Sequence, residues 1–168
     1  NDLPYQYQES ELAWQKLRKT IDPKDFKSSP ATGVDEKTIR YVLDKLTELP
    51  EGFTPLSKVK RLFKNIDKAR KADALNWGMG ELLAYGTLLM EGHNVRMSGQ
   101  DVRRGTFSHR HAILRDSENY SYYNRLSTLS GDQGEFHIYN SLLSEFAVLC
   151  FEFGYSMATP DDLILWEA

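Results

Sequence analysis

Two segments of the chain are nearly apolar on every side, and they constrain the fold more than any other feature. Residues 76–92 read NWGMGELLAYGTLLMEG, and residues 140–158 read NSLLSEFAVLCFEFGYSMA. A helix without a polar stripe has no face to present to water, so it packs inside other structure. We therefore expect two buried helices in the second part of the chain.

Each of these helices is followed by a short run that is typical of a strand. The first is HNVRMSG at 93–99, and the second is LILWEA at 163–168. Buried parallel strands are continuous apolar runs, as LILW is, and alternation of helix and strand favours an α/β fold with parallel strands. Residues 100–135, between them, are polar and rich in loop-forming residues. A chain that stops on an apolar strand is expected to be a piece of a longer protein.

The first 74 residues differ in character from the rest. They are rich in Lys and Glu and contain five of the six prolines. Asp35 is the expected N-cap of a helix with one apolar stripe, and Thr54 and Pro55 are expected to open another such helix. We therefore divide the chain into a helical extension at 1–74 and a truncated α/β domain at 75–168.

Composition excludes several classes of protein. A net charge of −3 and a pI near 5.8 do not favour nucleic acid or an anionic membrane as a partner. There is no run of about 18 apolar residues that could cross a bilayer. The single cysteine, Cys150, fits a reducing compartment. We expect a cytoplasmic protein with neither a nucleic acid nor a membrane as its partner.

Glu145 stands out because it lies near the start of the second apolar helix. A carboxylate surrounded by apolar side chains is desolvated, which raises its pKa and suits it to sharing a proton. The alternative is a glutamate at a helix start that faces water and is stabilised by the helix dipole.

The basic segment at 103–111 leaves several interpretations open. Arg103 and Arg104 are suited to binding a substrate carboxylate, but adjacent arginines are also common in solvated loops. On a strand, His109 and His111 would point the same way and suggest a metal site. No third ligand lies near them in the sequence, so we predict no metal site in this chain.

Three of these stretches together resemble one enzyme family. They are NWGMGELLAYGTLLMEGHNVRM, SGQDVRRGTFSHRH, and SLLSEFAVLCFEFGY followed by LILWEA. In this order and spacing they are similar to the decarboxylating, thiamine-diphosphate-dependent component of the 2-oxoglutarate dehydrogenase family, over about residues 49–168. The resemblance implies part of the thiamine-diphosphate-binding (pyrimidine) domain, with parallel strands and buried helices, preceded by a helical extension.

The resemblance also implies site residues. The motif LSE places Leu143, Ser144 and Glu145 at the cofactor, and Glu145 is implied to hydrogen-bond N1′ of the aminopyrimidine, which activates the cofactor. The loop after the first strand is implied to lie where domains and subunits meet. This makes Gln100, Asp101, His109 and His111 candidates for the active site or its entrance.

For the intact enzyme, the resemblance implies decarboxylation of 2-oxoglutarate in the tricarboxylic acid cycle. The succinyl group passes to a lipoyl arm of the dihydrolipoyl succinyltransferase component, and the enzyme is a homodimer. Mg²⁺ is bound through a GDG motif, which this chain lacks, so its ligands are expected upstream and the chain alone is expected to be inactive. Two alternatives stay open: a dehydrogenase for pyruvate or a longer 2-oxo acid, and a non-catalytic interaction module in which the helices of 1–74 dock a partner.

Overall fold

Helices and strands alternate along the second part of the chain. The computed structural model describes residues 4, 6, 9–17 and 20–167. The elements follow in the order α1 (Glu9–Lys16), a 3₁₀ helix η1 (Pro23–Phe26), α2 (Glu36–Thr47), α3 (Ser57–Lys71), α4 (Trp77–Met90), β1 (Val95–Gly99), β2 (Ile113–Arg115), β3 (Tyr122–Asn124), β4 (Phe136–Asn140), α5 (Glu145–Ala158) and β5 (Leu163–Glu167). The predicted α/β class is confirmed.

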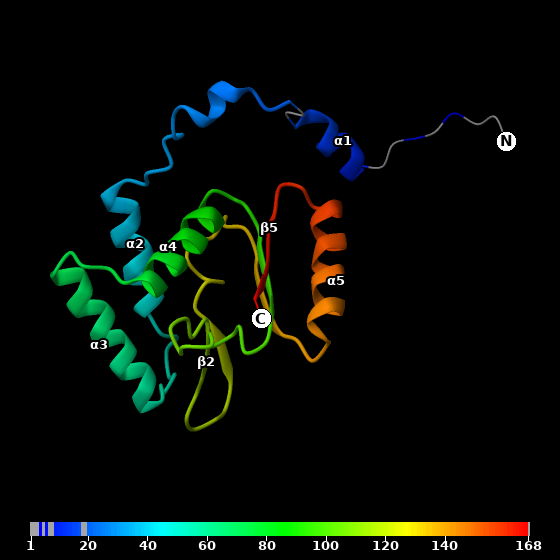
Figure 1. Ribbon diagram of the computed structural model, residues 1–168. Helices are drawn as coiled ribbons and strands as arrows, with labels where there is room; N and C mark the ends of the chain where they lie inside the picture. Colours follow the sequence, from blue (N-terminus) through cyan, green and yellow to red (C-terminus); the bar gives the residue numbers. More distant parts are fainter. Residues whose placement is uncertain (1–3, 5, 7–8, 18–19, 168) are drawn as a thin grey trace.

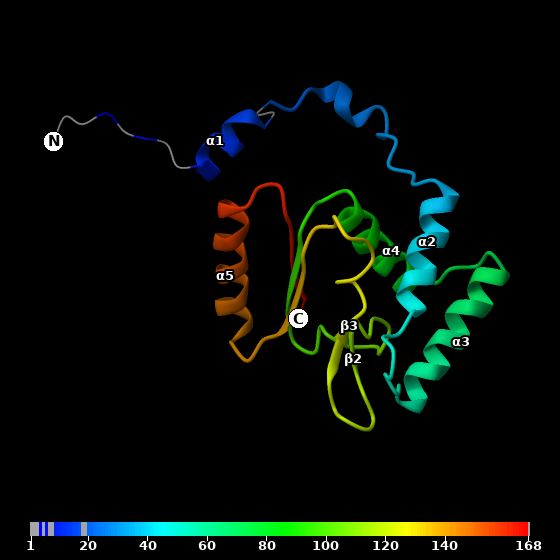
Figure 2. The ribbon, with the colours of Figure 1, turned by 180° about the vertical axis from the view of Figure 1, so that it is seen from behind.

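The centre of the molecule is a parallel sheet of three strands in the order β4-β1-β5. Figure 1 shows α5 on one face of this sheet and α4 on the other, with α2 and α3 outside α4. The reverse view in Figure 2 shows the same layers, with the small antiparallel pair β2–β3 beyond one end of the sheet. The two strands predicted from the sequence are β1 and β5, and they pair directly with each other.

The hydrophobic core lies between the sheet and the helices α2 and α4. Val42, Leu43 and Leu46 of α2 are buried in the same cluster as the apolar face of α4 and the inner side chains of β1 and β4. Seven of the fourteen residues of α4 are buried, which confirms the first predicted buried helix. Asp35 caps α2, as predicted, by accepting a hydrogen bond from the Thr38 amide at 2.9 Å. The next helix starts two residues later than Pro55, at Ser57.

The prediction of a second buried helix at 140–158 was wrong in two respects. Residues 136–140 form the edge strand β4, and the helix begins at Glu145. A strand of five residues with alternating buried side chains is too short to stand out beside a long apolar run. Within α5 only Val148 and Glu152 are buried, because the sheet covers one face and no other described element covers most of the opposite one.

A buried ion pair holds α5 on the sheet. Arg96 of β1 donates two hydrogen bonds to the Glu152 carboxylate, at 2.8 and 2.9 Å. The hydrogen bond to Glu152 raises the pKa of Arg96 above its ordinary value. The guanidinium also lies over the rings of Tyr139, Phe151 and Tyr155. The other large apolar side chains of α5 face outward and are exposed, among them Phe146, Leu149, Phe153 and Met157.

The N-terminal helix α1 reaches the far end of α5. Trp14 donates a hydrogen bond from Nε1 to the Met157 carbonyl at 2.7 Å, across 143 residues of sequence. Residues close to the two ends of the chain are therefore joined at one end of the molecule.

Two glycines of α4 provide a matched test of the core. A Cβ on Gly86 would lie 2.6 Å from Cγ1 of Val42, whereas a Cβ on Gly80 would meet no atom within 4 Å. We expect Gly86→Ala to lower the free energy of unfolding by about 1–3 kcal/mol through overpacking. Gly80→Ala is expected to raise it by about 0.5–1 kcal/mol, because alanine favours the helix. Urea denaturation of both variants measures the difference, and equal effects would contradict the close packing of α2 on α4.

In the part of the chain that the structure describes, no helix combines the length and the apolar character that crossing a bilayer requires.

Candidate active site

The carboxyl ends of the three parallel strands meet at one edge of the sheet. Gly99 at the end of β1 is in register with Asn140 of β4 and Glu167 of β5. In open α/β sheets, ligands bind in the crevice at this edge. The loop after β4 leads from here into α5, so the first turn of α5 lies at the same edge.

Local hydrogen bonds fix the chain where it enters α5. The Ser141 hydroxyl accepts a hydrogen bond from the Leu143 amide at 3.1 Å, and the Ser144 hydroxyl accepts one from the Ala147 amide at 3.3 Å. Ser144 is thereby the N-cap of the helix, and Glu145 is its first residue. The side chain of Glu145 is placed by a rigid element rather than by a loop.

Glu145 lines a cavity of about 310 Å³ at the carboxyl edge. Its carboxylate has no hydrogen-bond or ion-pair partner among the described residues, and the side chain is exposed. The expectation that Glu145 is desolvated was wrong for this chain, because the neighbouring Leu142, Leu143 and Phe146 side chains are exposed as well. The arrangement is a free carboxylate beside an uncovered apolar surface.

The other predicted site residues divide into two groups. Gln100 lines the same cavity as Glu145, as do Leu143 and Ser144. Asp101, by contrast, is exposed, has a positive φ of 60°, and pairs with Arg104. Neither it nor the two histidines lines this cavity.

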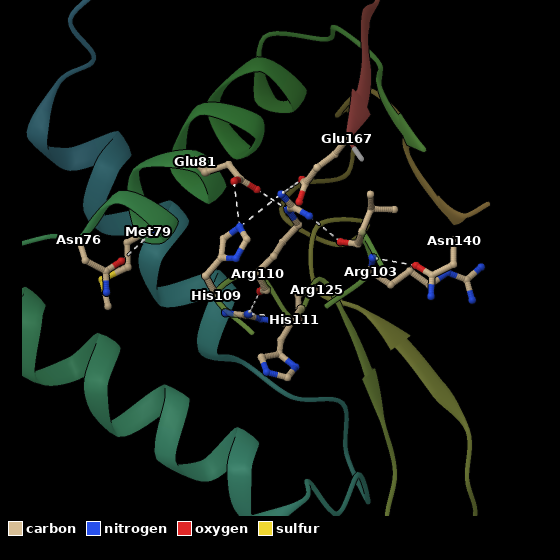
Figure 3. Close-up of polar contacts among 11 residues, drawn as sticks. Asn76, Met79, Glu81, Arg103, His109, Arg110, His111, Arg125, Asn140 and Glu167 are labelled. Atoms are coloured by element: carbon tan, nitrogen blue, oxygen red, sulfur yellow. Dashed lines mark hydrogen bonds and ion pairs between the residues drawn. The ribbon is translucent and has the colours of Figure 1, made fainter. Parts of the chain in front are cut away.

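His109 and His111 do not lie on a strand, and their side chains diverge. The prediction that they point the same way holds only for a strand, and residues 109–112 have no regular secondary structure. His109 lies 3.3 Å from Glu81 of α4, between Gly78 and Gly105, where an added Cβ would crowd its side chain. His111 has a positive φ of 41°, and its ring lies on the opposite side from Glu81 in Figure 3.

Arg110, between the two histidines, is the buried centre of a charged cluster that sequence reasoning missed. Its guanidinium is 1% exposed and pairs with Glu81 and with Glu167, at the end of β5; Figure 3 shows it between the two carboxylates. It also donates to the Val102 carbonyl at 2.7 Å. Burial alone would lower the pKa of Arg110, but the hydrogen bonds to the two carboxylates outweigh it and raise that pKa. Glu81 could have pointed to this cluster from the sequence, because it is a single charged residue near the start of an apolar helix and needs a partner.

Arg125 holds the backbone of the loop that carries Arg110 and His111. It is buried, has no carboxylate partner among the described residues, and donates to the carbonyls of Leu46 at 2.7 Å, His111 at 3.2 Å and Arg110 at 3.3 Å. Burial lowers its pKa to about 10. These bonds tie the end of α2 to the backbone that carries Arg110 and His111.

Burial and nearby positive charge act together on His111. Burial is the larger cause, and Lys58, Arg125, Arg104 and His109 add to it, so the pKa lies below the ordinary value of 6.5. The unfolded chain therefore binds this proton more tightly than the folded chain. The stability that this group contributes is fully present above pH 6.5 and is lost as the pH falls through the folded pKa.

We expect His111→Asn to flatten the decrease of the unfolding free energy below pH 6.5. Asparagine tolerates the positive φ of this position. One proton accounts for at most about 1.4 kcal/mol per pH unit. Urea denaturation between pH 5 and 8 measures the slope, with His137→Gln, a half-buried ring paired with Glu135, as the control. If the dependence of the unfolding free energy on pH were unchanged in His111→Asn, the lowered pKa of His111 would be contradicted.

Among the described residues, no group of three or more His, Cys, Asp or Glu side chains is arranged to hold a metal ion.

Comparison with known proteins identifies this architecture. Residues 73–168 match the family model described as the transketolase, pyrimidine binding domain. The mitochondrial 2-oxoglutarate dehydrogenase of Caenorhabditis elegans is 46% identical over 156 residues, which are 92% of this chain and 15% of the relative. That of Saccharomyces cerevisiae is 41% identical over 171 residues, covering 99% of this chain and 17% of the relative.

A bacterial relative is similar to this chain to the same degree. The 2-oxoglutarate dehydrogenase E1 component of Azotobacter vinelandii is 47% identical over 140 residues, which are 82% of this chain and 15% of the relative. The chain thus spans about a sixth of the length of these relatives. Because the model matches more than half of its residues, the chain belongs to the family of transketolase pyrimidine-binding domains, and it is similar in sequence to part of the 2-oxoglutarate dehydrogenases named above.

Proposed function

We propose that the chain is the pyrimidine-binding part of a thiamine-diphosphate-dependent 2-oxoglutarate dehydrogenase, which decarboxylates 2-oxoglutarate in the tricarboxylic acid cycle. The family match and the identity to relatives of that name support this proposal. The observation that carries it is the free carboxylate of Glu145, placed at the carboxyl edge of the sheet by the capped start of α5.

Glu145 is proposed to hold a proton at the ring nitrogen N1′ of the cofactor. When bound, thiamine diphosphate supplies the group that adds to the 2-oxo acid and accepts the electron pair left by carbon dioxide. The residues present fit its pyrimidine ring: an unpartnered carboxylate for the nitrogen and exposed apolar side chains, Leu142 and Leu143, for the ring. Closure of this surface by further protein would exclude water from the cavity.

The supporting roles follow from the same geometry. Ser144 fixes the first turn of the helix, and Leu143 and Gln100 line the cavity. Asp101, His109 and His111 are proposed as entrance residues, since they lie on the loops after β1 but outside the Glu145 cavity. The Mg²⁺ that accompanies the diphosphate is proposed to be bound by residues outside this chain.

The partners of the intact enzyme are proposed from its similarity to the 2-oxoglutarate dehydrogenases. The intact enzyme passes the succinyl group to a lipoyl arm of dihydrolipoyl succinyltransferase and forms a homodimer. The exposed Phe146, Leu149 and Phe153 of α5 support burial of this surface in an assembly.

The division of the chain at residue 74 is likewise a proposal, supported by the family match that starts at residue 73. The helices before it are proposed to brace the domain rather than to dock a partner, because Val42 and Leu46 of α2 belong to the core. For the compartment, the cytoplasmic prediction stays open, since the nematode and yeast relatives are named as mitochondrial.

The test is the reduction of an artificial electron acceptor by an intact protein containing this chain, with thiamine diphosphate and Mg²⁺. We expect turnover with 2-oxoglutarate and little with pyruvate or longer 2-oxo acids. If the enzyme preferred one of those acids, that acid would replace 2-oxoglutarate as the proposed substrate. The proposed dependence on thiamine diphosphate would be unaffected. The 168-residue chain alone is expected to give no turnover.

A further inference from the structure

A second cavity, on the other side of the end of β4, is lined by positive charge. It has a volume of about 360 Å³ and lies between the start of α3, the turn after β1 and the β2–β3 pair. Its basic side chains are Lys58, Arg103, Arg104, His111 and Arg115, and we call it the basic cavity. No carboxylate is among its lining residues.

The charge of the basic cavity is largely unneutralised. Within the described part of the chain, Lys58, Arg103 and Arg115 form no ion pair. Arg103 donates from Nε to the Ile138 carbonyl at 3.2 Å, and Arg115 lies over a tyrosine ring. Arg104 pairs with Asp101, yet its Nε is buried without a hydrogen-bond partner. Gathering these charges in one cavity costs free energy, which an anion would recover.

His111 adds a buried donor to the same cavity. Its side chain is 8% exposed, and its ring nitrogens have no hydrogen-bond partner among the described residues. The backbone around it is held by the bonds from its amide to the Arg104 carbonyl at 3.0 Å and from Arg125 to its own carbonyl at 3.2 Å. A residue other than glycine kept at positive φ by such bonds is common at ligand sites.

From this geometry we propose that the basic cavity binds a small polyvalent oxyanion, a molecule carrying phosphate or carboxylate groups. Guanidinium groups match such oxygens with paired hydrogen bonds, and a lysine adds a mobile point charge. The volume suits a small molecule rather than a macromolecule.

The basic cavity is separate from the cavity of Glu145. The two share no lining residue, and they lie on either side of the junction between Asn140 and Ser141. The inference therefore does not rest on the proposed role of Glu145, and binding can be measured without catalysis.

The test is titration of the 168-residue chain, at constant ionic strength, with pyrophosphate, inorganic phosphate, 2-oxoglutarate and succinate in separate experiments. NMR of the histidine ring protons follows His111, and calorimetry gives the affinity. We expect saturable binding of at least one probe, with an upward shift of the His111 titration midpoint, because an anion offsets the surrounding positive charge.

Matched variants locate the site. Lys58→Gln and Arg115→Gln remove exposed charges that make no hydrogen bond within the described structure, and each is expected to weaken binding by about tenfold. Lys60→Gln removes the same charge from the same helix outside the cavity and should leave the affinity within about twofold.

Saturation by the phosphate probes alone would assign a phosphate ligand, and saturation by the dicarboxylates alone would assign a carboxylate. Either result supports the site. Absence of saturation with every probe overturns it, as does equal weakening by Lys58→Gln and Lys60→Gln.

Discussion

Replacing Glu145 by glutamine is expected to lower the turnover of the 2-oxo acid by the intact enzyme by a factor of about 10²–10⁴, the usual effect of losing an acid–base group. Glutamine keeps the size of the side chain and its position at the start of α5. It cannot share a proton with a ring nitrogen. The assay is acceptor reduction with thiamine diphosphate and Mg²⁺ at saturating 2-oxo acid.

The control for this variant is Glu91→Gln, which removes an exposed carboxylate at the end of α4, outside the cavity. Its turnover should match that of the unmodified enzyme. Cofactor affinity, followed by fluorescence quenching, separates loss of chemistry from loss of binding. Full activity of Glu145→Gln would show that the proposed proton transfer to the cofactor does not depend on this residue. The family assignment would not be affected.

Replacing Arg110 by methionine is expected to lower the free energy of unfolding by about 3–5 kcal/mol, as breaking a buried ion pair typically does. The guanidinium joins Glu81 of α4 to Glu167 of β5 and the Val102 carbonyl. Methionine fills much of the volume but leaves two carboxylates facing each other without their cation. Urea denaturation of the 168-residue chain gives the change.

The comparison for Arg110 is Arg40→Met, which breaks an exposed pair with Glu36 one helical turn away. We expect it to leave the free energy of unfolding nearly unchanged, because solvent-exposed ion pairs contribute little. The triple variant Arg110→Met, Glu81→Gln, Glu167→Gln should recover part of the loss, since it removes the unpaired charges. A loss below about 1 kcal/mol in Arg110→Met would mean that water replaces the guanidinium.

Much of the fold is readable from the sequence because long apolar runs dominate it. The helix at 76–92 and the strands at 93–99 and 163–168 correspond to α4, β1 and β5. β4 was missed because five residues with alternating burial give a weak signal. The uncovered face of α5 was missed for another reason: apolarity shows that a surface is to be covered, but not by which part of a protein.

The candidate site shows a similar division. The resemblance implied Glu145 as a cofactor-binding residue and Gln100 as a candidate for the active site or its entrance, and both line one cavity in the structure. The Arg110 cluster joins positions 81, 110 and 167, and the basic cavity joins helix α3 to the loops after β1. Such pairings depend on the register of strands and on loop paths, which local sequence patterns do not determine.

The hydrogen bond from Trp14 to the Met157 carbonyl has a kinetic meaning as well. It closes a loop of 143 residues, and because such long-range closure is costly, we expect it to form after the sheet, α4 and α5 have assembled. We therefore expect this contact to be absent from the transition state for folding. Loss of this hydrogen bond is then expected to leave the folding rate nearly unchanged and to speed unfolding. In kinetic terms, α1 slows the unfolding of the native state.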